Sequence, residues 1–159
     1  MVTEEEVREY LSQAYYISRR IRSQQDKCAE LRAKALQQTS QWSDTPSGGH
    51  STTSPQAVWI EKLVLLELEI QNKTANLIQA ERDAFSLINL LSDHREKAVL
   101  EDFHVNRLNN AKLSMKYDYS ESQILRIKNK GYRHLAKLIN EDASLENKIR
   151  MTLIPQAKR

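Results

Sequence analysis

The pattern of a short helix, a tight turn and a longer helix occupies residues 110–135, which read NAKLSMKYDYSESQILRIKNKGYRHL. Asp118 and Tyr119 form the predicted turn, because Asp tolerates left-handed backbone geometry. Ser120 and Gln123 have the spacing of a capping box, which begins the longer helix. Four residues of that helix share one face and are expected to point inward: Ile124, Ile127, Gly131 and Leu135. The stretch therefore predicts a helix-turn-helix pair.

Another helix before this pair completes a predicted three-helix module over residues 93–140. We expect it over residues 94–107, capped near Asp93, with core candidates Ala98, Val99, Leu100 and Phe103. Residues 141–159 follow as a short amphipathic tail helix, capped by Asn140, and a frayed end.

Two long heptad seams precede the module and predict an antiparallel helical hairpin, a coiled coil, over residues 1–92. A Ser/Thr/Gly/Pro-rich loop at residues 39–55 separates them. The apolar positions of the first seam are Tyr10, Ala14, Ile17, Ile21, Cys28, Leu31 and Ala35. Those of the second seam are Trp59, Leu63, Leu66, Ile70, Leu77, Ala80, Ala84, Leu87 and Leu91.

Each seam contains one polar interruption, Gln24 in the first and Lys73 in the second. Aligning the seams so that these two residues share a layer pairs Leu31 with Leu66 and Cys28 with Ile70, whereas a register one heptad away would place each polar residue opposite an apolar one. This register puts the centre of the connection at Gly48 and Gly49.

The composition excludes several other classes of protein. Only three Gly and three Pro occur in 159 residues, whereas sandwiches, barrels and Rossmann units need turn residues along the whole chain. One cysteine excludes an internal disulfide framework. The acidic start is unlike a signal peptide, and no apolar run reaches the roughly 20 residues that span a bilayer. We therefore expect an all-α protein in the cytoplasm, without membrane contact.

The positive charge of the chain is concentrated in the predicted module. The whole chain has a net charge of +3, but residues 103–140 contain eight Lys/Arg and only two Asp/Glu. Clustered positive charge on a small module is typical of polyanion binding. A solvated basic surface without a partner is the alternative reading of the same cluster.

The longer helix of the pair contains the side chains that would contact double-stranded DNA. Its first two turns contain the expected base-reading residues Glu121, Ser122, Gln123, Leu125 and Arg126. Five basic residues of the two helices are expected at phosphates, where contacts set register rather than sequence: Lys112, Lys116, Lys128, Lys130 and Arg133.

The stretch from Tyr119 to Leu135 resembles the recognition helix of region four in bacterial sigma factors. The shared frame is the Ser120 cap, the Ile124/Ile127 core pair, Lys130 and the Arg133/Leu135 ending. The longer layout, with Ser43-Asp44-Thr45-Pro46 in the loop, is similar to the RinA/ArpU-like phage regulators of late transcription. This resemblance implies DNA binding, activation of phage genes and contact with RNA polymerase in the bacterial host cytoplasm.

The second long helix has more apolar residues than one seam requires. A second stripe contains Val64, Leu68, Ala75, Ile78 and Phe85, and Leu65 and Ile88 widen it. An exposed stripe of this length usually marks an interface, so we expect a homodimer that packs as a four-helix bundle. The alternative is that the C-terminal module or the tail helix covers the stripe.

No catalytic set, metal site or cofactor site is apparent, so we do not expect an enzyme. Cys28 lies in an apolar seam, which predicts a buried structural thiol. His94, His104 and His134 share no ligand spacing, and no Gly-rich phosphate loop occurs. Two functions remain: a sequence-specific DNA-binding transcription regulator, or a protein-interaction adaptor whose acidic hairpin binds polymerase or another regulator without reading DNA.

Overall fold

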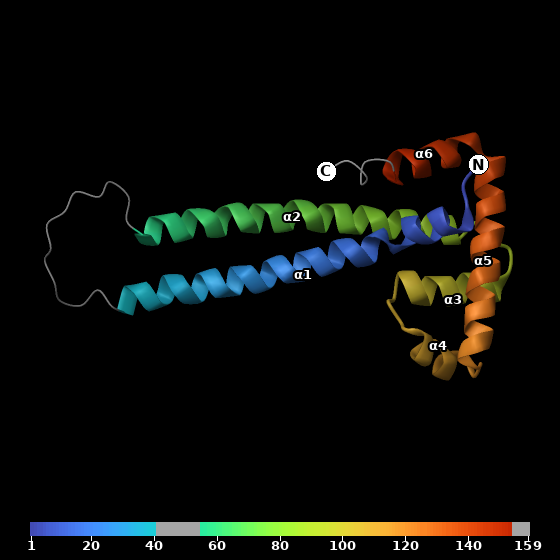
Figure 1. The fold of residues 1–159 in the computed structure, drawn as a ribbon, viewed down its shortest axis with the longest axis horizontal. Helices are drawn as coiled ribbons and strands as arrows, with labels where there is room; N and C mark the ends of the chain where they lie inside the picture. Colours follow the sequence, from blue (N-terminus) through green and yellow to red (C-terminus); the bar gives the residue numbers. More distant parts are fainter. Residues whose placement is uncertain (41–54, 154–159) are drawn as a thin grey trace, which may run out of the picture. The chain divides into compact units, whose positions relative to one another are not determined.

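A computed structural model describes residues 1–40 and 55–153, and these residues form six α-helices and no strand (Figure 1). The all-α prediction is therefore confirmed. The predicted loop centre at Gly48 and Gly49, and the loop motif at residues 43–46, lie outside the described residues. The helices are α1 (Glu4–Ser40), α2 (Pro55–Ile88), α3 (His94–His104), α4 (Asn110–Tyr117), α5 (Glu121–Glu141) and α6 (Ala143–Leu153).

The chain divides into two compact units whose boundary differs from the one expected near residue 92. A two-helix unit contains residues 17–76, and a six-helix unit contains residues 1–16 and 77–159. The first turns of α1 and the last turns of α2 belong to the six-helix unit, because their apolar residues enter the same core as α3, α5 and α6. Segments at the two ends of the sequence thus build one core.

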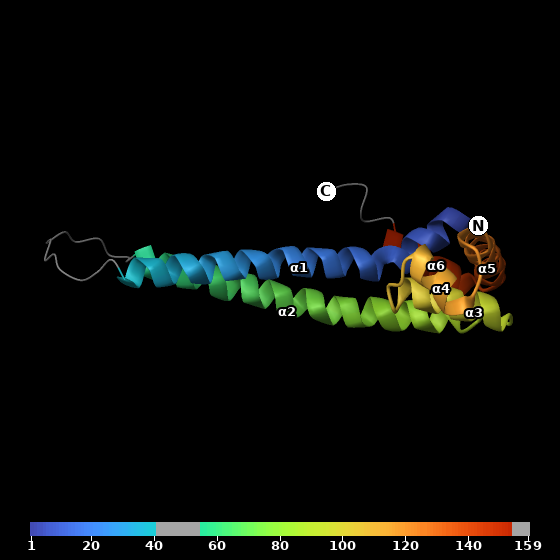
Figure 2. The same cartoon turned by 90° about the horizontal axis from the view of Figure 1, so that it is seen from below.

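The two-helix unit consists of antiparallel segments of α1 and α2 that lie side by side in both views (Figures 1 and 2). Arg32 forms an ion pair with Glu67 across the helices, and the Lys34 ammonium lies 5.8 Å from the centre of the Trp59 ring. Cys28 is buried in this unit as a free thiol, as the seam predicts.

The polar residues Gln24 and Lys73 meet at a third side chain that the seam pattern does not indicate. Gln24 Nε2 donates a 2.7 Å hydrogen bond to Glu69 Oε2, and Lys73 Nζ lies 3.9 Å from the same oxygen. Glu69 therefore interacts with both polar positions. The remaining amide oxygen of Gln24 is buried and has no hydrogen-bond partner among the described residues.

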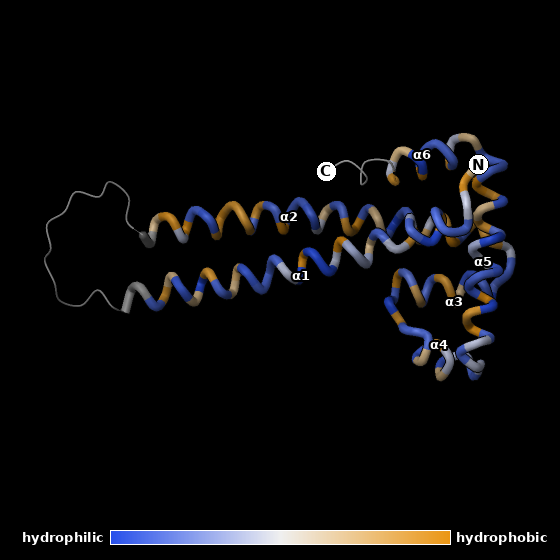
Figure 3. Tube along the Cα trace, in the orientation of Figure 1, coloured by the Kyte–Doolittle hydropathy of each residue, from blue (hydrophilic) through white to orange (hydrophobic). Residues whose placement is uncertain are grey.

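The core of the six-helix unit is built around α5, which contacts α3, α4 and α6. Apolar positions of its helices alternate with polar ones along each turn (Figure 3), as expected for helices with one buried face. Gly131 allows the close approach of α3, because a Cβ atom there would lie 2.8 Å from Leu100 Cδ1. The buried members of this core are Val2, Val7, Tyr10, Leu11, Ala84, Leu87, Ile88, Leu91, Leu100, Tyr132, Leu135, Ala136, Ile139 and Ile149.

Helix α3 ends at His104, three residues before the predicted end. The chain turns there because Asp102 interacts with residues beyond the helix: its carbonyl oxygen accepts the Leu108 N–H, and its carboxylate accepts the Asn106 side-chain amide at 2.8 Å. Arg107 adopts a left-handed backbone conformation with φ of 58°.

The tail helix forms, but Asn140 does not cap it. Asp142 accepts the N–H groups of Ser144 and Leu145 at the start of α6, at 2.9 and 3.3 Å. The Asn140 side chain instead accepts the Val2 N–H at 2.6 Å and donates to the Val2 carbonyl at 3.0 Å. Asn140 thereby attaches the residues before α1 to α5.

No helix within residues 1–40 and 55–153 is long and apolar enough to cross a membrane.

Candidate nucleic-acid interface

The connection between α4 and α5 has the geometry that the sequence predicts. Asn109 caps α4 by accepting the Lys112 N–H at 2.9 Å, and Asp118 ends it with a left-handed backbone at φ of 55°. Ser120 then caps α5 in a reciprocal capping box: its backbone N–H donates to Gln123 Oε1 at 2.9 Å, and its Oγ accepts the Gln123 N–H. These local bonds fix how the two helices meet.

A small apolar cluster holds α3, α4 and α5 together. Val99, Leu113 and Ile124, one residue from each helix, are almost completely buried in it. Five partly buried residues surround them: Phe103, Leu108, Tyr117, Tyr119 and Ile127. Since Ile124 and Ile127 point into this cluster, the opposite side of the first turns of α5 faces solvent.

The five expected base-reading residues, Glu121, Ser122, Gln123, Leu125 and Arg126, are all exposed on α5. Leu125 is 49 % exposed, which is notable for a large apolar side chain. In the capping box, the side-chain oxygen Oε1 of Gln123 already accepts a hydrogen bond. A bidentate contact with adenine needs both this oxygen and the side-chain nitrogen of the same amide. Ser122 Oγ lies 3.0 Å from Ser120 Oγ and is part of the same cap.

Three of the five expected phosphate-binding residues form ion pairs within the chain. Lys116 Nζ lies 2.5 Å from Asp102, Lys130 Nζ lies 3.5 Å from Glu96, and Arg133 Nε lies 3.2 Å from Glu4. All three basic side chains are more than half exposed, so each also reaches solvent. Lys112 is exposed as well.

The expectation that Lys128 contacts phosphate is wrong, because its side chain is buried. Lys128 is 5 % exposed, its ammonium donates to Asn110 Oδ1 at 3.0 Å, and the same nitrogen lies 3.2 Å from the centre of the Phe103 ring. Burial, together with the nearby Arg8 charge, lowers the pKa of Lys128 to about 8. The residue faces inward because it lies one turn after Ile124 on the core face.

Asp102 is a buried carboxylate that organises the α3–α4 side of the site. Burial would raise its pKa, but hydrogen bonds from Lys116, Tyr117 and Asn106 outweigh that effect and hold the pKa below its usual value. The Tyr117 hydroxyl donates to it at 2.6 Å. Asp102 is therefore ionised, and it fixes the position of the Lys116 side chain.

The start of α1 contacts α5 through interactions that the sequence does not indicate. Arg8 donates to Asn129 at 3.3 Å and lies over the Tyr132 ring, 5.0 Å from its centre. The Tyr132 hydroxyl lies 2.8 Å from His104 Nε2, and burial lowers the pKa of His104 to about 3. This histidine is therefore neutral at physiological pH, and α1 and α5 are linked by a buried polar cluster.

Two exposed basic residues near these positions were not anticipated, Lys137 and Arg95. Lys137 extends the exposed cations of α5 into a row with steps of four, three and four residues, so that one side of the helix bears them all. The sequence contains this spacing, which could have identified Lys137. We call this set the basic row, and its members are Arg126, Lys130, Arg133 and Lys137.

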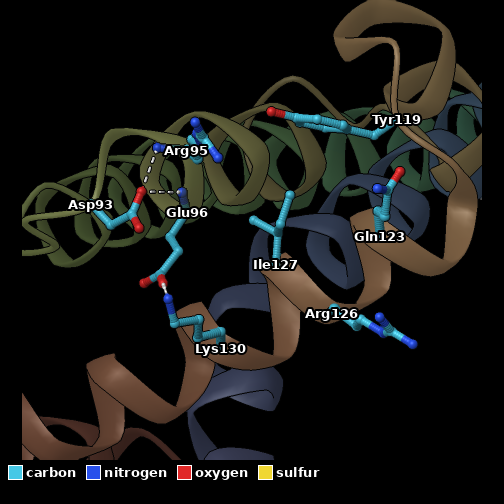
Figure 4. A pocket seen from close by; sticks show the side chains of 8 residues that line it. All are labelled: Asp93, Arg95, Glu96, Tyr119, Gln123, Arg126, Ile127 and Lys130. Atoms are coloured by element: carbon cyan, nitrogen blue, oxygen red, sulfur yellow. Dashed lines mark hydrogen bonds and ion pairs between the residues drawn. The ribbon is translucent and has the colours of Figure 1, made fainter.

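Arg95 lines a hollow of about 290 Å³ between the start of α3 and the first half of α5 (Figure 4). The side chain of Lys130 points toward Glu96 in this hollow, whereas the Arg126 guanidinium points away from both. The other lining residues are Asp93, Tyr119, Gln123 and Ile127.

Within the described residues, no group of three or more His, Cys, Asp or Glu side chains is arranged to hold a metal ion.

The fold and this surface define an all-α protein in which a helix, a three-residue turn and a second helix expose a row of basic side chains. A family model described as "Protein of unknown function (DUF1492)" matches residues 36–136, and the chain belongs to this family. The matched region ends within α5 and includes the whole α4–α5 turn. Comparison with the curated proteins and with the solved structures gave no match.

Proposed function

We propose that this protein is a sequence-specific DNA-binding transcription regulator of the RinA/ArpU-like phage type, with α5 as its recognition helix. The observation that carries the proposal is the division of α5 into two faces. One face packs in the core through Ile124, and the other exposes Ser122, Leu125 and the basic row, which begins with Arg126. An exposed polar first turn followed by cations suits insertion into a major groove with flanking phosphate contacts.

The proposal is tested by fluorescence anisotropy with a duplex selected from a random pool, measured across a salt series. Arg126→Ala is expected to lose about 1–3 kcal/mol of discrimination at one base pair, because Arg recognises guanine by a bidentate contact. Lys130→Ala is expected to weaken binding to all sequences alike and to lower the salt slope by about 1. Full affinity of both variants for the best duplex would contradict the assignment of α5.

The second candidate function is a protein-interaction adaptor, and the ion pairs of the site favour it. Carboxylates already neutralise part of the charge of Lys116, Lys130 and Arg133, which reduces the attraction to phosphate. For this function, the protein would bind RNA polymerase or another regulator and show no salt-dependent affinity for duplexes. The salt series separates the two functions directly.

We further propose that the protein acts in the bacterial host cytoplasm as a homodimer that also contacts RNA polymerase, without an enzymatic activity or a cofactor. The dimer proposal is supported by apolar residues of α2 that remain exposed in each unit. Val64 and Leu68 are 48 % and 51 % exposed in the two-helix unit, and Ile78 and Phe85 are 46 % and 44 % exposed in the six-helix unit. Ile88, expected in the same stripe, is instead completely buried in the core.

A further inference from the structure

We propose that the hollow between α3 and α5 binds a phosphate group of the DNA backbone, with Arg95 and Lys130 as the side chains that hold it. This inference rests on the proposed DNA-binding function and adds to it an anion site supplied by two different helices. Arg95 precedes the predicted helix-turn-helix pair, so the site extends the interface beyond that pair.

The Arg95 side chain takes no part in the core of the six-helix unit. It is exposed, and its guanidinium forms no hydrogen bond or ion pair with the part of the chain that the structure describes. A guanidinium presents paired N–H groups that match two oxygens of a phosphate. The site is not a bare helix N-terminus, because the Asp93 carboxylate already accepts the N–H groups of Arg95 and Glu96.

Glu96 explains how Lys130 is held at the hollow. The Glu96 side chain is 2 % exposed, and its Oε2 lies 2.7 Å from His134 Nδ1. Its Oε1 has no hydrogen-bond partner among the described residues, and the nearest cation is Lys130 Nζ at 3.5 Å. An ammonium has three donors, so Lys130 can remain beside Glu96 while its other N–H groups bind a phosphate. Glu96 is therefore a positioning residue for Lys130.

The remaining lining residues separate anion binding from base reading. Tyr119 points its hydroxyl in the direction of Arg95 and supplies a further donor, whereas Arg126 points out of the hollow (Figure 4). Arg126 lies one helical turn before Lys130. A phosphate held by Arg95 and Lys130 would thus fix the register of α5 while Arg126 stays available for a base edge.

The test compares Arg95→Ala with Arg22→Ala, which removes an exposed arginine of the two-helix unit that does not line the hollow. Affinity is measured by anisotropy across a salt series, for the selected duplex and for a scrambled duplex of equal length. We expect Arg95→Ala to weaken both duplexes by a similar factor, roughly tenfold, and to lower the salt slope by about 0.9. Arg22→Ala is expected to leave both quantities unchanged.

Suppose that Arg95→Ala and its control have the same affinity and the same salt slope, while Arg126→Ala still reduces the discrimination between the selected and the scrambled duplex. That result would overturn the phosphate site and leave the proposed function intact. If the wild-type chain binds no duplex even at low salt, both the proposed function and the assignment to a DNA phosphate are wrong. Titration with inorganic phosphate, followed by amide chemical shifts, then identifies the source of the ligand. Inorganic phosphate that shifts the amide signals of residues 93–96 and 126–130 saturably, but does not compete with DNA, would show that the hollow binds free phosphate and not a phosphate of the DNA backbone. That result also overturns the proposal.

Discussion

At the scale of single residues, Lys128 shows how far the environment changes the role of a basic side chain. Its pKa of about 8 lies below the usual value of 10.5, so the folded state binds fewer protons than the unfolded state between these two pH values. Stability contributed by this residue therefore rises with pH across that window and is lowest below pH 8. A change of one pKa unit corresponds to about 1.4 kcal/mol.

We predict that Lys128→Met abolishes this pH dependence, because Met fills the same space without a charge. The free energy of unfolding of the wild type, relative to that of the variant, is expected to rise by about 2–3 kcal/mol from pH 7 to pH 10. Urea unfolding followed by circular dichroism at the two pH values measures it. Lys137→Met, at an exposed position of the same helix, is the control. If the free energies of unfolding of wild type and Lys128→Met differ by the same amount at both pH values, burial of the ammonium does not destabilise the folded protein.

At the scale of the helices, Asn140 determines how the start of the chain joins α5. Its amide makes two hydrogen bonds with the backbone of Val2, a residue 138 positions away in the sequence. We predict that Asn140→Ala lowers the free energy of unfolding by about 1–3 kcal/mol, because it leaves two partly buried backbone groups without a partner.

Hydrogen exchange gives a second measurement of the Asn140 variant. The Val7 N–H donates to the Thr3 carbonyl in the first turn of α1, and its protection should fall when this turn frays. Asn147→Ala, at an exposed position of α6, is the matched control. If the two variants are equally stable and equally protected, the bonds to Val2 contribute nothing to the attachment of α1.

The elements that sequence reasoning identified are those fixed by neighbouring residues. The Ser120 capping box and the left-handed Asp118 depend on bonds within five residues, so local spacing was sufficient to predict them. The inward orientation of Lys128 follows from the same helical period as Ile124, so its position on the helix, and not its charge, determines where it lies. The role of Asn140 could not be predicted, because its partner, Val2, approaches only when both ends of the chain pack in one core.

At the scale of the whole molecule, the exposed apolar residues of α2 concern assembly rather than folding. Ile60 and Leu65 are also about half exposed, beside Val64 and Leu68 in the two-helix unit. Neighbouring apolar side chains in water are unusual for a monomer, and a second copy of the same helix offers a complementary surface. The alternative that the C-terminal module or the tail helix covers Ile78 and Phe85 disagrees with their exposure in the structure.

We predict that the wild-type chain is a dimer at tens of micromolar by light scattering, and that Val64→Glu and Phe85→Glu each convert it to a monomer. A carboxylate placed in an apolar interface loses its hydration without gaining a partner, so dissociation is favoured. Asn76→Glu adds the same charge at an exposed polar position of α2 that lies off this stripe, and it should remain dimeric. Because a dimer brings two copies of α5 to paired half-sites, the monomeric variants should also bind the selected duplex more weakly, although α5 itself is unchanged. A monomeric wild type, or glutamate variants that stay dimeric, would show that α2 does not form the interface.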